Sequence, residues 1–554
     1  MKRKIKKVYY ADTETTQPHK DYGVRVYLWA IVGNGEQYTG ESVDSLIRKM
    51  KKLKGIFYFH NLKFDFSYIH YYLIQNDIKC NILEKNGVIY SAKFFNVELR
   101  DSMNFLQMSL AEVGKNYCKT YQKTSIDYNV DYWHKATEEE KEYCINDCKV
   151  LEEGLTNYFE TLKNVLISAG ATYSAESMPY KLTNSGIAFE AFKELSDFDR
   201  LCPKTTISEY RLFRKAYNGG YVFSRPSEIV KNVNMFDVNS MYPYVYSEKP
   251  LPFGNGKTCR SFEEAEKYNF YICEIDIMYT LNEGYIPIIG GGINKLGKAH
   301  YKAFSDDIET LCVSNIDLKL IKRFYNCEIA FKWAVGFETK PYFFKKYADT
   351  FMAVKQNERG AKRNVAKVLL NSPYGKTAMN GLHEIKNYYI GADGTIKNEI
   401  VGYQLSEESY QYLPIAIAIT AYAREMLLTS AESIGFEKIQ YMDTDSIKFT
   451  GKIPENLNID PEKIGCWKDE GVATYFKTLA PKKYMVYKEG EIDVKCAGFN
   501  KKILEKELKC GQKVDEKTAL KLFDKFEVGL TLDCLQSKKL QGGRGLLNVT
   551  KEIK

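Results

Sequence analysis

The chain lacks the features that mark several common protein classes. Its 13 cysteines are scattered without CxxC pairs, and the only regular pair, Cys144 and Cys148, has helical spacing. This pattern favours reduced thiols over disulfides or a zinc site. No apolar run approaches the length of a membrane span, and Val8 to Ala11, after the basic N-terminus, is too short for the apolar part of a signal peptide. We therefore expect an intracellular, soluble protein.

The sequence also lacks a complete phosphate-binding loop. Gly292 to Lys298 fits the pattern GxxxxGK, but Ala299 stands where such a loop needs the serine or threonine that binds Mg²⁺. The surroundings resemble a loop. We interpret this stretch as a glycine-rich surface loop and not as an NTPase site.

Composition bounds the remaining possibilities. At 554 residues the chain is too long for one hydrophobic core and suggests about three to five modules. The net charge is only +8, on 79 basic and 71 acidic side chains, so a polyanionic partner requires the positive excess to be concentrated on one surface. The 43 tyrosines, interleaved with Lys and Arg, suit stacking on single-stranded nucleic acid, although an AT-rich genome would enrich tyrosine equally well.

Two aspartates lie one residue apart between short alternating segments. Asp443 and Asp445 separate Ile439–Tyr441 from Ile447–Phe449, and these segments are typical of the two arms of a hairpin. Carboxylates at i and i+2 project from the same side of an extended backbone. Such oxygen ligands favour Mg²⁺ or Mn²⁺, and two ions about 4 Å apart clamp both oxygens of a phosphoryl transfer. An Asp-rich turn is the alternative interpretation.

A third aspartate is the natural partner of this hairpin. Met235 to Pro243 begins as a strand, places Asp237 at its end and then is expected to turn under Pro243. Between the two acidic segments, residues 355 to 374 have a helical pattern. Arg363, Lys367 and Asn371 follow one another at i+4, whereas Val365, Val368 and Leu369 face elsewhere. The cationic stripe suits a triphosphate, although a solvated basic face is the alternative.

A separate acidic cluster is predicted near the N-terminus. Lys7 to Ala11 is typical of a strand, and it leads into Asp12 and Glu14; a second strand, Ile56 to His60, leads into Asp65. Thr137 and Glu140 form a capping box, and the helix that they start carries Tyr143 and Asp147 on one face. A tyrosine hydroxyl beside a carboxylate can orient a metal-bound water. Acids at strand ends and a solvated Tyr–Asp pair are the alternatives.

These motifs together resemble known enzymes. The N-terminal cluster of Asp12, Glu14, Asp65, Tyr143 and Asp147 resembles the three exonuclease motifs of the DnaQ-like fold of proofreading DNA polymerases. FDVNSMYP, KVLLNSPYG, YMDTDS and Lys482-Lys483-Tyr484 resemble, in order, motifs A, B, C and KxY of family B DNA polymerases. The resemblance extends from residue 9 to about residue 500.

Further segments resemble the protein-primed branch of the family, of the phi-twenty-nine-like phage type. The first exonuclease acid is at residue 12, which leaves no room for the extra N-terminal domain of cellular members. Segments 283–287 and 314–318 resemble one terminal-protein-region insert, and the Gly-punctuated segment from Asn380 to Tyr412 resembles the other. Segment 217–221 is similar to the YxGG linker, and segment 495–498 precedes a short thumb.

The resemblance implies a multidomain fold that combines α/β and α+β parts. A DnaQ-like, RNase H-like 3′ to 5′ exonuclease domain would be followed by a right-hand polymerase. The implied ranges are exonuclease 1–172, palm 173–248 and 413–497, first insert 249–342, fingers 343–378, second insert with the strand-displacement hairpin 379–412, and thumb 498–554.

The resemblance also implies roles for individual residues. Two Mg²⁺ or Mn²⁺ ions per site would be bound by Asp12, Glu14, Asp65 and Asp147 in the exonuclease and by Asp237, Val238 and Asp445 in the polymerase, with Asp443 accessory and with Tyr143 and Lys123 catalytic in the exonuclease. Nucleotide contacts would come from Val238, Tyr242 as steric gate, Lys355, Arg363, Lys367 and Tyr374. DNA contacts would come from Thr15, His60, Asn61, Phe64, Ser102, Tyr217, Gly219, Gly220, Ser240, Asn371, Ser372, Gly375, Thr420, Arg424, Lys482 and Tyr484.

The implied partners are template and primer DNA, dNTPs and a terminal protein that acts as primer, in the cytoplasm of an infected host cell. The sequence departs from the family pattern at Phe66, which replaces a glycine, at Pro373, which predicts a helix end or kink, and at Asn218, which replaces a basic residue. Three alternatives are a nuclease with a vestigial polymerase site, a non-catalytic binding module, and a conventional polymerase that extends RNA primers.

Overall fold

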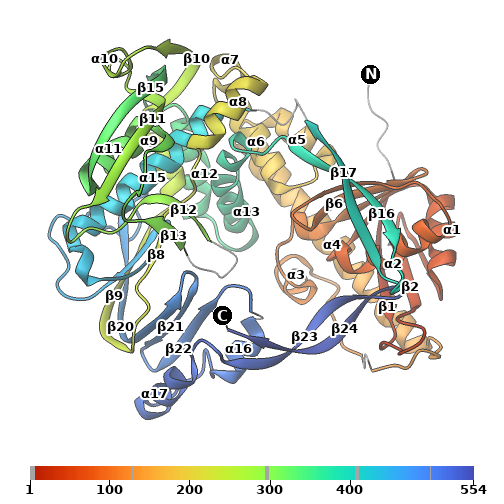
Figure 1. The fold of residues 1–554 in the computed structure, drawn as a ribbon. Coiled ribbons are helices and arrows are strands. Elements are labelled where there is room, and N and C mark those ends of the chain that lie inside the picture. The colour runs from red at the N-terminus through yellow and green to blue at the C-terminus, as the bar shows by residue number, and fades with distance from the viewer. Residues whose placement is uncertain (1–6, 127–128, 294–298, 406–410, 500, 554) are drawn as a thin grey trace.

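The computed structural model describes residues 7–126, 129–293, 299–405, 411–499 and 501–553. Figure 1 shows the N-terminal part of the chain, in red and orange, beside a larger body built from the remaining residues. The long C-terminal hairpin reaches back to the N-terminal part, where the Val24 amide donates to the Gln541 carbonyl over 3.1 Å. Within the described ranges, no helix is both long and apolar enough to cross a membrane.

The N-terminal part is a seven-stranded mixed sheet with helices on both faces. The strand order is β3-β2-β1-β4-β7-β6-β5, and β4 runs parallel to both β1 and β7. Helix α4 covers one face through Cys144 and Cys148, which pack on Tyr27 and Leu28, while α1 and α2 cover the other. The elements are β1 (Val8–Thr15), β2 (Val26–Gly33), β3 (Glu36–Gly40), α1 (Val43–Leu53), β4 (Gly55–Phe59), α2 (Leu62–Gln75), β5 (Asn81–Lys85), β6 (Val88–Phe94), β7 (Val97–Asp101), α3 (Leu110–Tyr117) and α4 (Glu138–Ser168).

A second seven-stranded sheet, fully antiparallel, holds the other acidic cluster. Its order is β22-β21-β20-β9-β19-β18-β8, so the central strand β9 lies between the hairpin β18–β19 and the long strand β20. The members are β8 (Val222–Ser224), β9 (Val230–Val238), β18 (Ile439–Asp443), β19 (Ser446–Phe449), β20 (Trp467–Ala480), β21 (Lys483–Lys488) and β22 (Glu491–Cys496).

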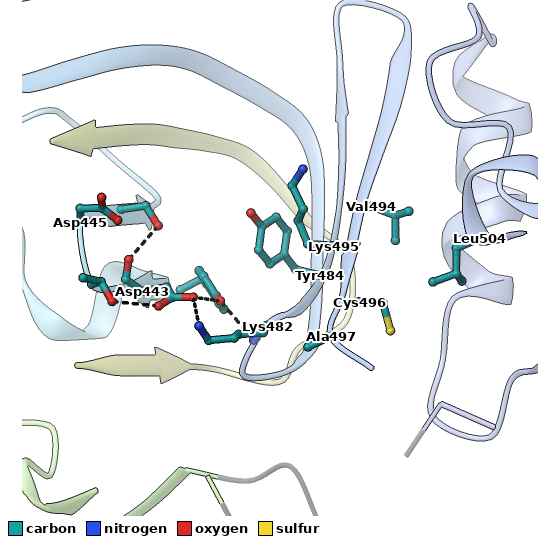
Figure 2. A pocket seen from close by; sticks show the side chains of 12 residues that line it. Asp443, Asp445, Lys482, Tyr484, Val494, Lys495, Cys496, Ala497 and Leu504 are labelled. Carbon is teal, nitrogen blue, oxygen red and sulfur yellow. Dashed lines mark hydrogen bonds and ion pairs between the residues drawn. The ribbon is translucent and has the colours of Figure 1, made fainter. Parts of the chain in front are cut away.

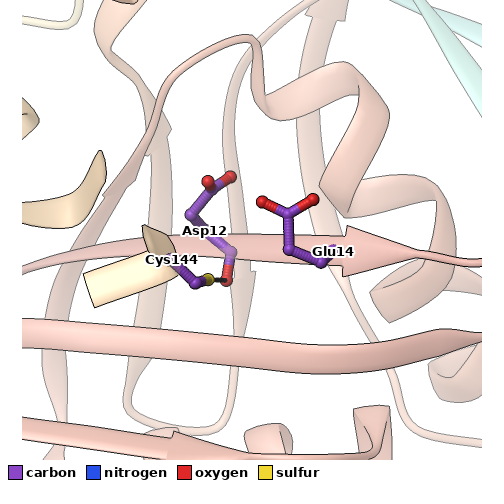
Figure 3. A group of neighbouring side chains, drawn as sticks. All are labelled: Asp12, Glu14 and Cys144. Carbon is purple, nitrogen blue, oxygen red and sulfur yellow. Dashed lines mark hydrogen bonds between the residues drawn. The ribbon is translucent and has the colours of Figure 1, made fainter. Parts of the chain in front are cut away.

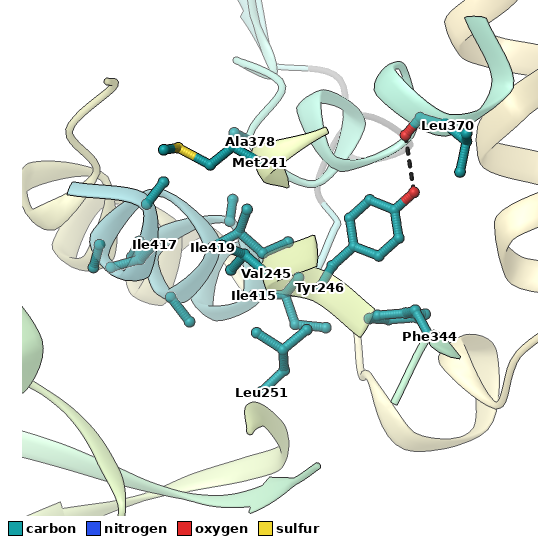
Figure 4. Packing of buried hydrophobic residues seen from close by; sticks show 14 of the residues in the cluster. Met241, Val245, Tyr246, Leu251, Phe344, Leu370, Ala378, Ile415, Ile417 and Ile419 are labelled. Carbon is teal, nitrogen blue, oxygen red and sulfur yellow. Dashed lines mark hydrogen bonds between the residues drawn. The ribbon is translucent and has the colours of Figure 1, made fainter. Parts of the chain in front are cut away.

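Two helices support this sheet from one side. Helix α15 (Leu413–Ile434) is buried along most of its length, as expected for a helix that is apolar on nearly all faces. It packs against α9 (Met241–Glu248), and Figure 4 shows Ile415 and Ile419 beside Val245. The Tyr246 hydroxyl donates to the Leu370 carbonyl over 2.9 Å. This bond ties the helix after Asp237 to the segment that carries the predicted cationic stripe.

Short helices connect the N-terminal part to the second sheet, and an insert follows. The connecting helices are α5 (Thr172–Ser177), α6 (Asn184–Glu194), α7 (Phe198–Leu201) and α8 (Ile207–Phe213). The insert is a four-stranded antiparallel sheet of order β10-β15-β11-β14 with a small ribbon β12–β13. Its elements are β10 (Leu251–Cys259), α10 (Phe262–Ala265), β11 (Phe270–Leu281), β12 (Ile289–Ile293), β13 (Ala299–Lys302), β14 (Glu309–Ser314), α11 (Asn315–Phe324) and β15 (Tyr325–Lys340).

The cationic segment is three helices and not the single helix that the pattern predicted. They are α12 (Lys345–Asn357), α13 (Gly360–Asn371) and α14 (Tyr374–Thr377). The first break falls at Glu358 and Arg359, where Gly360 has φ +59°, a conformation that glycine adopts without strain. The second precedes Pro373, as predicted for a residue that lacks an amide hydrogen.

The remaining elements form two long hairpins and a small helical unit. The predicted hairpin between Asn380 and Tyr412 is confirmed as β16 (Leu382–Ile390) and β17 (Ile396–Leu405), joined by a five-residue loop with Gly394 at φ +69°. The C-terminal part contains α16 (Lys501–Glu507), α17 (Glu516–Lys525), β23 (Thr531–Leu540) and β24 (Gly543–Glu552).

Two local predictions were wrong. Pro243 does not mark a turn: it lies in the first turn of α9, where the missing amide hydrogen costs no helical bond. The surroundings of the GxxxxGK stretch are not a loop either, because strands β12 and β13 flank it. Residues 294–298 themselves lie outside the described ranges.

Candidate active sites

The hairpin that carries Asp443 and Asp445 forms as predicted, with Asp443 opposite Ser446. Ser446 also pairs with Asp237 on β9, and the Val238 amide donates to the Asp445 carbonyl over 2.7 Å. The predicted partnership between motif A and the hairpin is therefore present in the backbone register. The adjoining cavity, of about 570 Å³, is lined by Asp443, Asp445, Lys482, Tyr484 and residues of β22 (Figure 2).

The acids of this site repel one another. Burial and then the charge of Asp445 raise the pKa of Asp237 to about 7, and burial raises that of Asp445. Asp443 has a different environment, because its carboxylate lies 3.4 Å from the Lys482 ammonium and accepts from the Tyr441 hydroxyl over 3.3 Å. Hard oxygen donors that repel one another fit a divalent cation. Asp237 and Asp445 are the better candidates, because Lys482 already compensates Asp443.

Aromatic and cationic side chains border the acids on one side. Tyr242 and Tyr374 stack with ring centroids 4.3 Å apart. Lys355 donates to the Ser240 hydroxyl over 2.8 Å, and its pKa is lowered by burial and by Arg363 and Lys367. Although Lys355 lies on α12 and the other two cations on α13, the helix break brings all three together. Their mutual repulsion fits an anionic ligand such as a triphosphate. Asn371 is exposed on α13, and Ser372 and Gly375 line a separate cavity nearby.

The N-terminal acids come from three elements and meet across the first sheet. Asp12 and Glu14 lie at the end of β1, which runs to Thr15, and both carboxylates point to the same side of the strand, as predicted (Figure 3). Asp65 is in the first turn of α2, where the Thr13 hydroxyl donates to it over 2.6 Å. Burial raises the pKa of Glu14 to about 8, with Asp147 adding to the shift, and that of Asp65 to about 7.

Lys123, Tyr143 and Asp147 form one group, as the resemblance implied. The Thr137–Glu140 capping box that starts α4 is confirmed. Lys123 donates to the Tyr143 hydroxyl over 2.6 Å and forms an ion pair with Asp147. The second carboxylate oxygen of Asp147 is buried without a hydrogen-bond partner. An unsatisfied buried carboxylate oxygen beside three other acids fits a divalent ion.

A thiol also lies near these acids. Within the described part of the chain, one group of at least three His, Cys, Asp or Glu side chains could hold a metal ion. It consists of Asp12, Glu14 and Cys144, whose ligand atoms all lie within 4.8 Å of one another. Burial raises the pKa of the Cys144 thiol, and its sulfur contacts the Asp12 carbonyl oxygen (Figure 3). A protonated thiol is a poor ligand for a hard cation. The carboxylates are therefore the fitting ligands, and Cys144 is a packing residue.

Predicted DNA contacts near the first site divide into open and engaged positions. Thr15, Asn61 and Phe64 are partly or fully exposed around the acids. Asn61 has φ +70° and its amide donates to Asp101. In contrast, Ser102 is fully buried, donates to the Phe59 carbonyl and bonds to His60, whose other ring nitrogen meets the Met108 carbonyl. This arrangement favours an indirect role for Ser102.

The same division holds in the second site. Tyr217, Gly219, Lys482 and Tyr484 are accessible to some degree, and Gly220 lies against Thr444 so closely that a side chain would collide. Thr420 is 1% exposed and donates back into α15. Arg424 is buried and donates to both carboxylate oxygens of Asp317 and to the carbonyls of Asn218 and Gly219. Arg424 therefore holds the 217–220 loop in this conformation, whereas Thr420 is engaged within its own helix.

Three site residues were missed from the sequence. Thr13 bonds to Asp65, Asp317 anchors Arg424, and Lys448 lies buried beneath the second acidic cluster. Asp317 was inside a segment singled out as part of an insert, but its partner is 107 positions away. Lys448 could have been found by the alternation of its strand, since it falls on the same side as Ser446.

Comparison with known proteins decides the family. A model of the family "DNA polymerase type B, organellar and viral" matches residues 46–136 and 129–464. The chain belongs to this family. It is 29% identical to the DNA polymerase of Bacillus phage Nf over 95% of this chain and 96% of that protein, and 28% identical to that of Bacillus phage phi29 over the whole of both.

A solved structure extends the match to three dimensions. The phi29 DNA polymerase in a ternary complex with primer-template DNA and incoming nucleotides superimposes with a TM-score of 0.84, at 26% identity, over 99% of this chain and all of that one. The predicted fold class is thereby confirmed, and so is the prediction that the chain is a DNA polymerase of the phi29-like phage type. The roles of individual residues stay predictions.

Proposed function

We propose that this enzyme replicates a linear phage-type genome by protein priming, with a 3′ to 5′ proofreading exonuclease and intrinsic strand displacement. DNA template, primer and dNTPs would be its substrates, and a terminal protein would supply the first priming hydroxyl. The whole-length match to the phage enzymes supports this function. A conventional primer-extending polymerase without protein priming is the alternative.

In the polymerase site, Asp237, the Val238 carbonyl and Asp445 would hold two Mg²⁺ or Mn²⁺ ions, whose chemistry is to polarise the attacking and leaving oxygens. Lys355, Arg363 and Lys367 would orient the triphosphate. Tyr242 would pack beneath the sugar and exclude a 2′-hydroxyl, and Tyr374 would pack on the new base pair.

In the exonuclease site, Asp12, Glu14, Asp65 and Asp147 would hold a second pair of ions. Tyr143 would orient the attacking water, and Lys123 would stabilise the charge that develops on the phosphodiester. Thr15, Asn61 and Phe64 would hold the frayed 3′ end. The two sites draw on different sheets, which supports separate ions and separate activities.

The observation that supports strand displacement is a set of contacts by which the hairpin β16–β17 would close a ring around the template. Lys386 on β16 is paired with Glu84 over 2.5 Å, and the Tyr388 ring meets His70 edge-on at 4.7 Å, so the hairpin contacts the N-terminal part. The hairpin also contacts the C-terminal hairpin: Lys539 of β23 donates to the carbonyl of Ile396, the first residue of β17, over 3.0 Å. The C-terminal hairpin in turn contacts the N-terminal part. A closed ring of this kind would admit one template strand and peel off the other.

Replacing residues 384–406 by a short Gly/Ser linker tests this account. We expect single-nucleotide addition to survive and long displacement synthesis to be lost, because the ring would open. A matched control replaces only the loop 391–395, which leaves both strands in place. Extension on primed single-stranded circles is compared with extension on gapped duplex. A deletion that copies past the downstream strand as far as the parent enzyme contradicts the ring account.

Protein priming needs its own test. Incubation with a candidate terminal protein, labelled dATP and Mg²⁺ should transfer label to that protein, and the Asp445→Ala variant should not. Label that reaches only DNA primers would favour the conventional alternative.

A further inference from the structure

Lys448 is an unusual residue for the middle of a polymerase sheet. Its side chain is only 4% exposed, yet it carries an ammonium group. It lies on β19 opposite Tyr441 on one side and Met235 on the other. Buried lysines are rare unless a partner compensates the charge.

The register places Lys448 on the catalytic side of the sheet. Residues directly opposite one another in an antiparallel pair share a face, and so do residues two apart on one strand. Ser446 is opposite both Asp237 and Asp443, and Lys448 is two residues after Ser446. The ammonium therefore projects on the side of the acids and not into the helices beneath.

The partners of this ammonium are aromatic faces and not a single carboxylate. Its nitrogen lies 5.5 Å from the ring centroid of Tyr441 and 5.0 Å from that of Tyr484. Among the described residues it forms no direct ion pair or hydrogen bond. The charges that act on it are those of Glu470, Asp237, Asp443 and Asp445, and it lowers the pKa of both Asp237 and Asp445 in return.

A cation held in this way differs from Lys482. The Lys482 side chain is about half exposed and is paired with Asp443. Lys448 is only 4% exposed and lies over the rings of Tyr441 and Tyr484. Burial lowers the pKa of Lys448, and the nearby carboxylates act against this shift. In its charged form the ammonium adds to the field at the acids, and burial reduces the screening that weakens exposed charges.

We propose that Lys448 is a positioning residue of the polymerase site, a resident cation that sets how strongly Asp237 and Asp445 hold divalent ions. This inference rests on the proposed two-ion site. The ammonium offsets the repulsion among the acids before ions bind, and it repels the ions once they arrive. The site then needs a higher Mg²⁺ concentration to fill than it would with the acids alone. Bound ions can therefore exchange between one nucleotide addition and the next.

The test uses the full chain in an Asp12→Ala, Glu14→Ala background, so that exonuclease ions do not contribute. Thermal unfolding is followed while MgCl₂ alone is titrated at pH 8.5, above the pKa of Asp237. In the Lys448→Met variant we expect the Mg²⁺ concentration for half-maximal stabilisation to fall at least about threefold, because a fixed positive charge has been removed from a poorly screened site. The Mg²⁺ dependence of primer extension should shift the same way.

Two comparisons separate charge from packing. Lys448→Arg keeps the charge and should restore the parent midpoint to within about twofold, whereas Lys448→Gln is a second neutral variant in case methionine disturbs folding. Lys468→Met is the comparison for an exposed cation: Lys468 is opposite Asp237 and also lowers its pKa, but solvent screens its charge, so the midpoint should fall less than in Lys448→Met.

The outcomes are distinct. An unchanged or raised midpoint in both neutral variants overturns the inference. An Asp445→Asn variant that keeps the parent response to Mg²⁺ would instead show that the proposed ion site itself is wrong. If Asp445→Asn loses the response while Lys448→Met matches the parent, only the role of Lys448 fails.

Discussion

The two acidic sites of this polymerase each bring mutually repelling carboxylates together, but they use different kinds of elements to do so. In the N-terminal site the acids come from β1, α2 and α4, and Lys123 forms a direct ion pair with Asp147. In the second site they come from one strand end and one hairpin, and the directly paired lysine serves only Asp443. The second site therefore keeps its principal acids free of a direct cationic partner.

The degree of burial follows the same contrast. Burial raises the pKa of Glu14 to about 8 and that of Asp237 to about 7. Glu14, Asp65 and Asp147 are buried, whereas Asp237, Asp443 and Asp445 are partly exposed on one face of the second sheet. Both sites are short of positive charge, but each packs against its own hydrophobic cluster. Changes in one site should therefore leave the other intact.

The largest effect is expected for Asp445→Ala. Loss of a proposed ion ligand should reduce nucleotide addition by at least about a thousandfold, since metal ions contribute several kcal/mol of transition-state stabilisation. Degradation of single-stranded DNA should continue at the parent rate. Primer extension and 3′ trimming are measured on the same preparation. Extension near the parent rate would show that Asp445 is only part of an Asp-rich turn.

The converse change is Asp12→Ala with Glu14→Ala. Excision should fall about as steeply, because both acids lie on β1 at the centre of the N-terminal cluster. Extension of a matched primer should survive, and mismatched termini should accumulate. The assay follows a labelled 3′ single strand over time. A double variant that still trims this strand would contradict the assignment of excision to the N-terminal acids.

A smaller effect is expected for a change at Tyr242, which concerns sugar selection in the second site. Tyr242 stacks on Tyr374 beside the acids, whereas in the N-terminal site Tyr143 is hydrogen-bonded to Lys123. Tyr242→Val should lower discrimination against ribonucleotides by roughly ten- to a hundredfold, as expected when one steric contact worth 1–3 kcal/mol is removed. The measurement is the ratio of dNTP to rNTP incorporation efficiency. No change in the ratio would make Tyr242 a packing residue, and Tyr244 on the same helix serves as the control position.

The contrast also shows where sequence was informative. The Asp443–Asp445 hairpin and the Thr137–Glu140 capping box were predictable, because each depends on residues within a few positions. The helix break at Gly360 was missed, because periodicity continues across it. Lys123 came only from the family resemblance, since nothing local links it to Asp147.

Burial of polar side chains was the least predictable property. Ser102 and Thr420 were expected to contact DNA, yet both donate to nearby backbone carbonyls and face away from open surface. The Thr420 bond is local to α15, whereas the Ser102 bond joins elements that are far apart in sequence. Lys448 was hidden for the same reason: the strand pattern fixes its side of the sheet, but only the assembled sheet shows the two rings above it.

The smallest effect at pH 7 is expected at the junction between the two regions, on helix α2. This helix carries Asp65 in its first turn and His70 one turn later, and the His70 ring is stacked on Phe66 and meets Tyr388 of the hairpin edge-on. Burial lowers the pKa of His70 to about 4 from an ordinary value of 6.5. As the pH falls through this window, the unfolded chain takes up the proton first, so stability is retained above pH 6.5 and lost toward pH 4.

His70→Phe keeps the ring and removes the proton site. We expect stability at pH 7 to change by less than about 1 kcal/mol, and the loss between pH 6.5 and pH 4 to shrink by up to about 3 kcal/mol. Chemical unfolding at four pH values measures both. His19→Phe is the control, because His19 belongs to the same part of the chain and stacks on Tyr22 instead of on Phe66 and Tyr388. If the parent and His70→Phe lose stability equally on acidification, His70 is not protected by this junction, and the hairpin is held there by the Lys386–Glu84 pair instead.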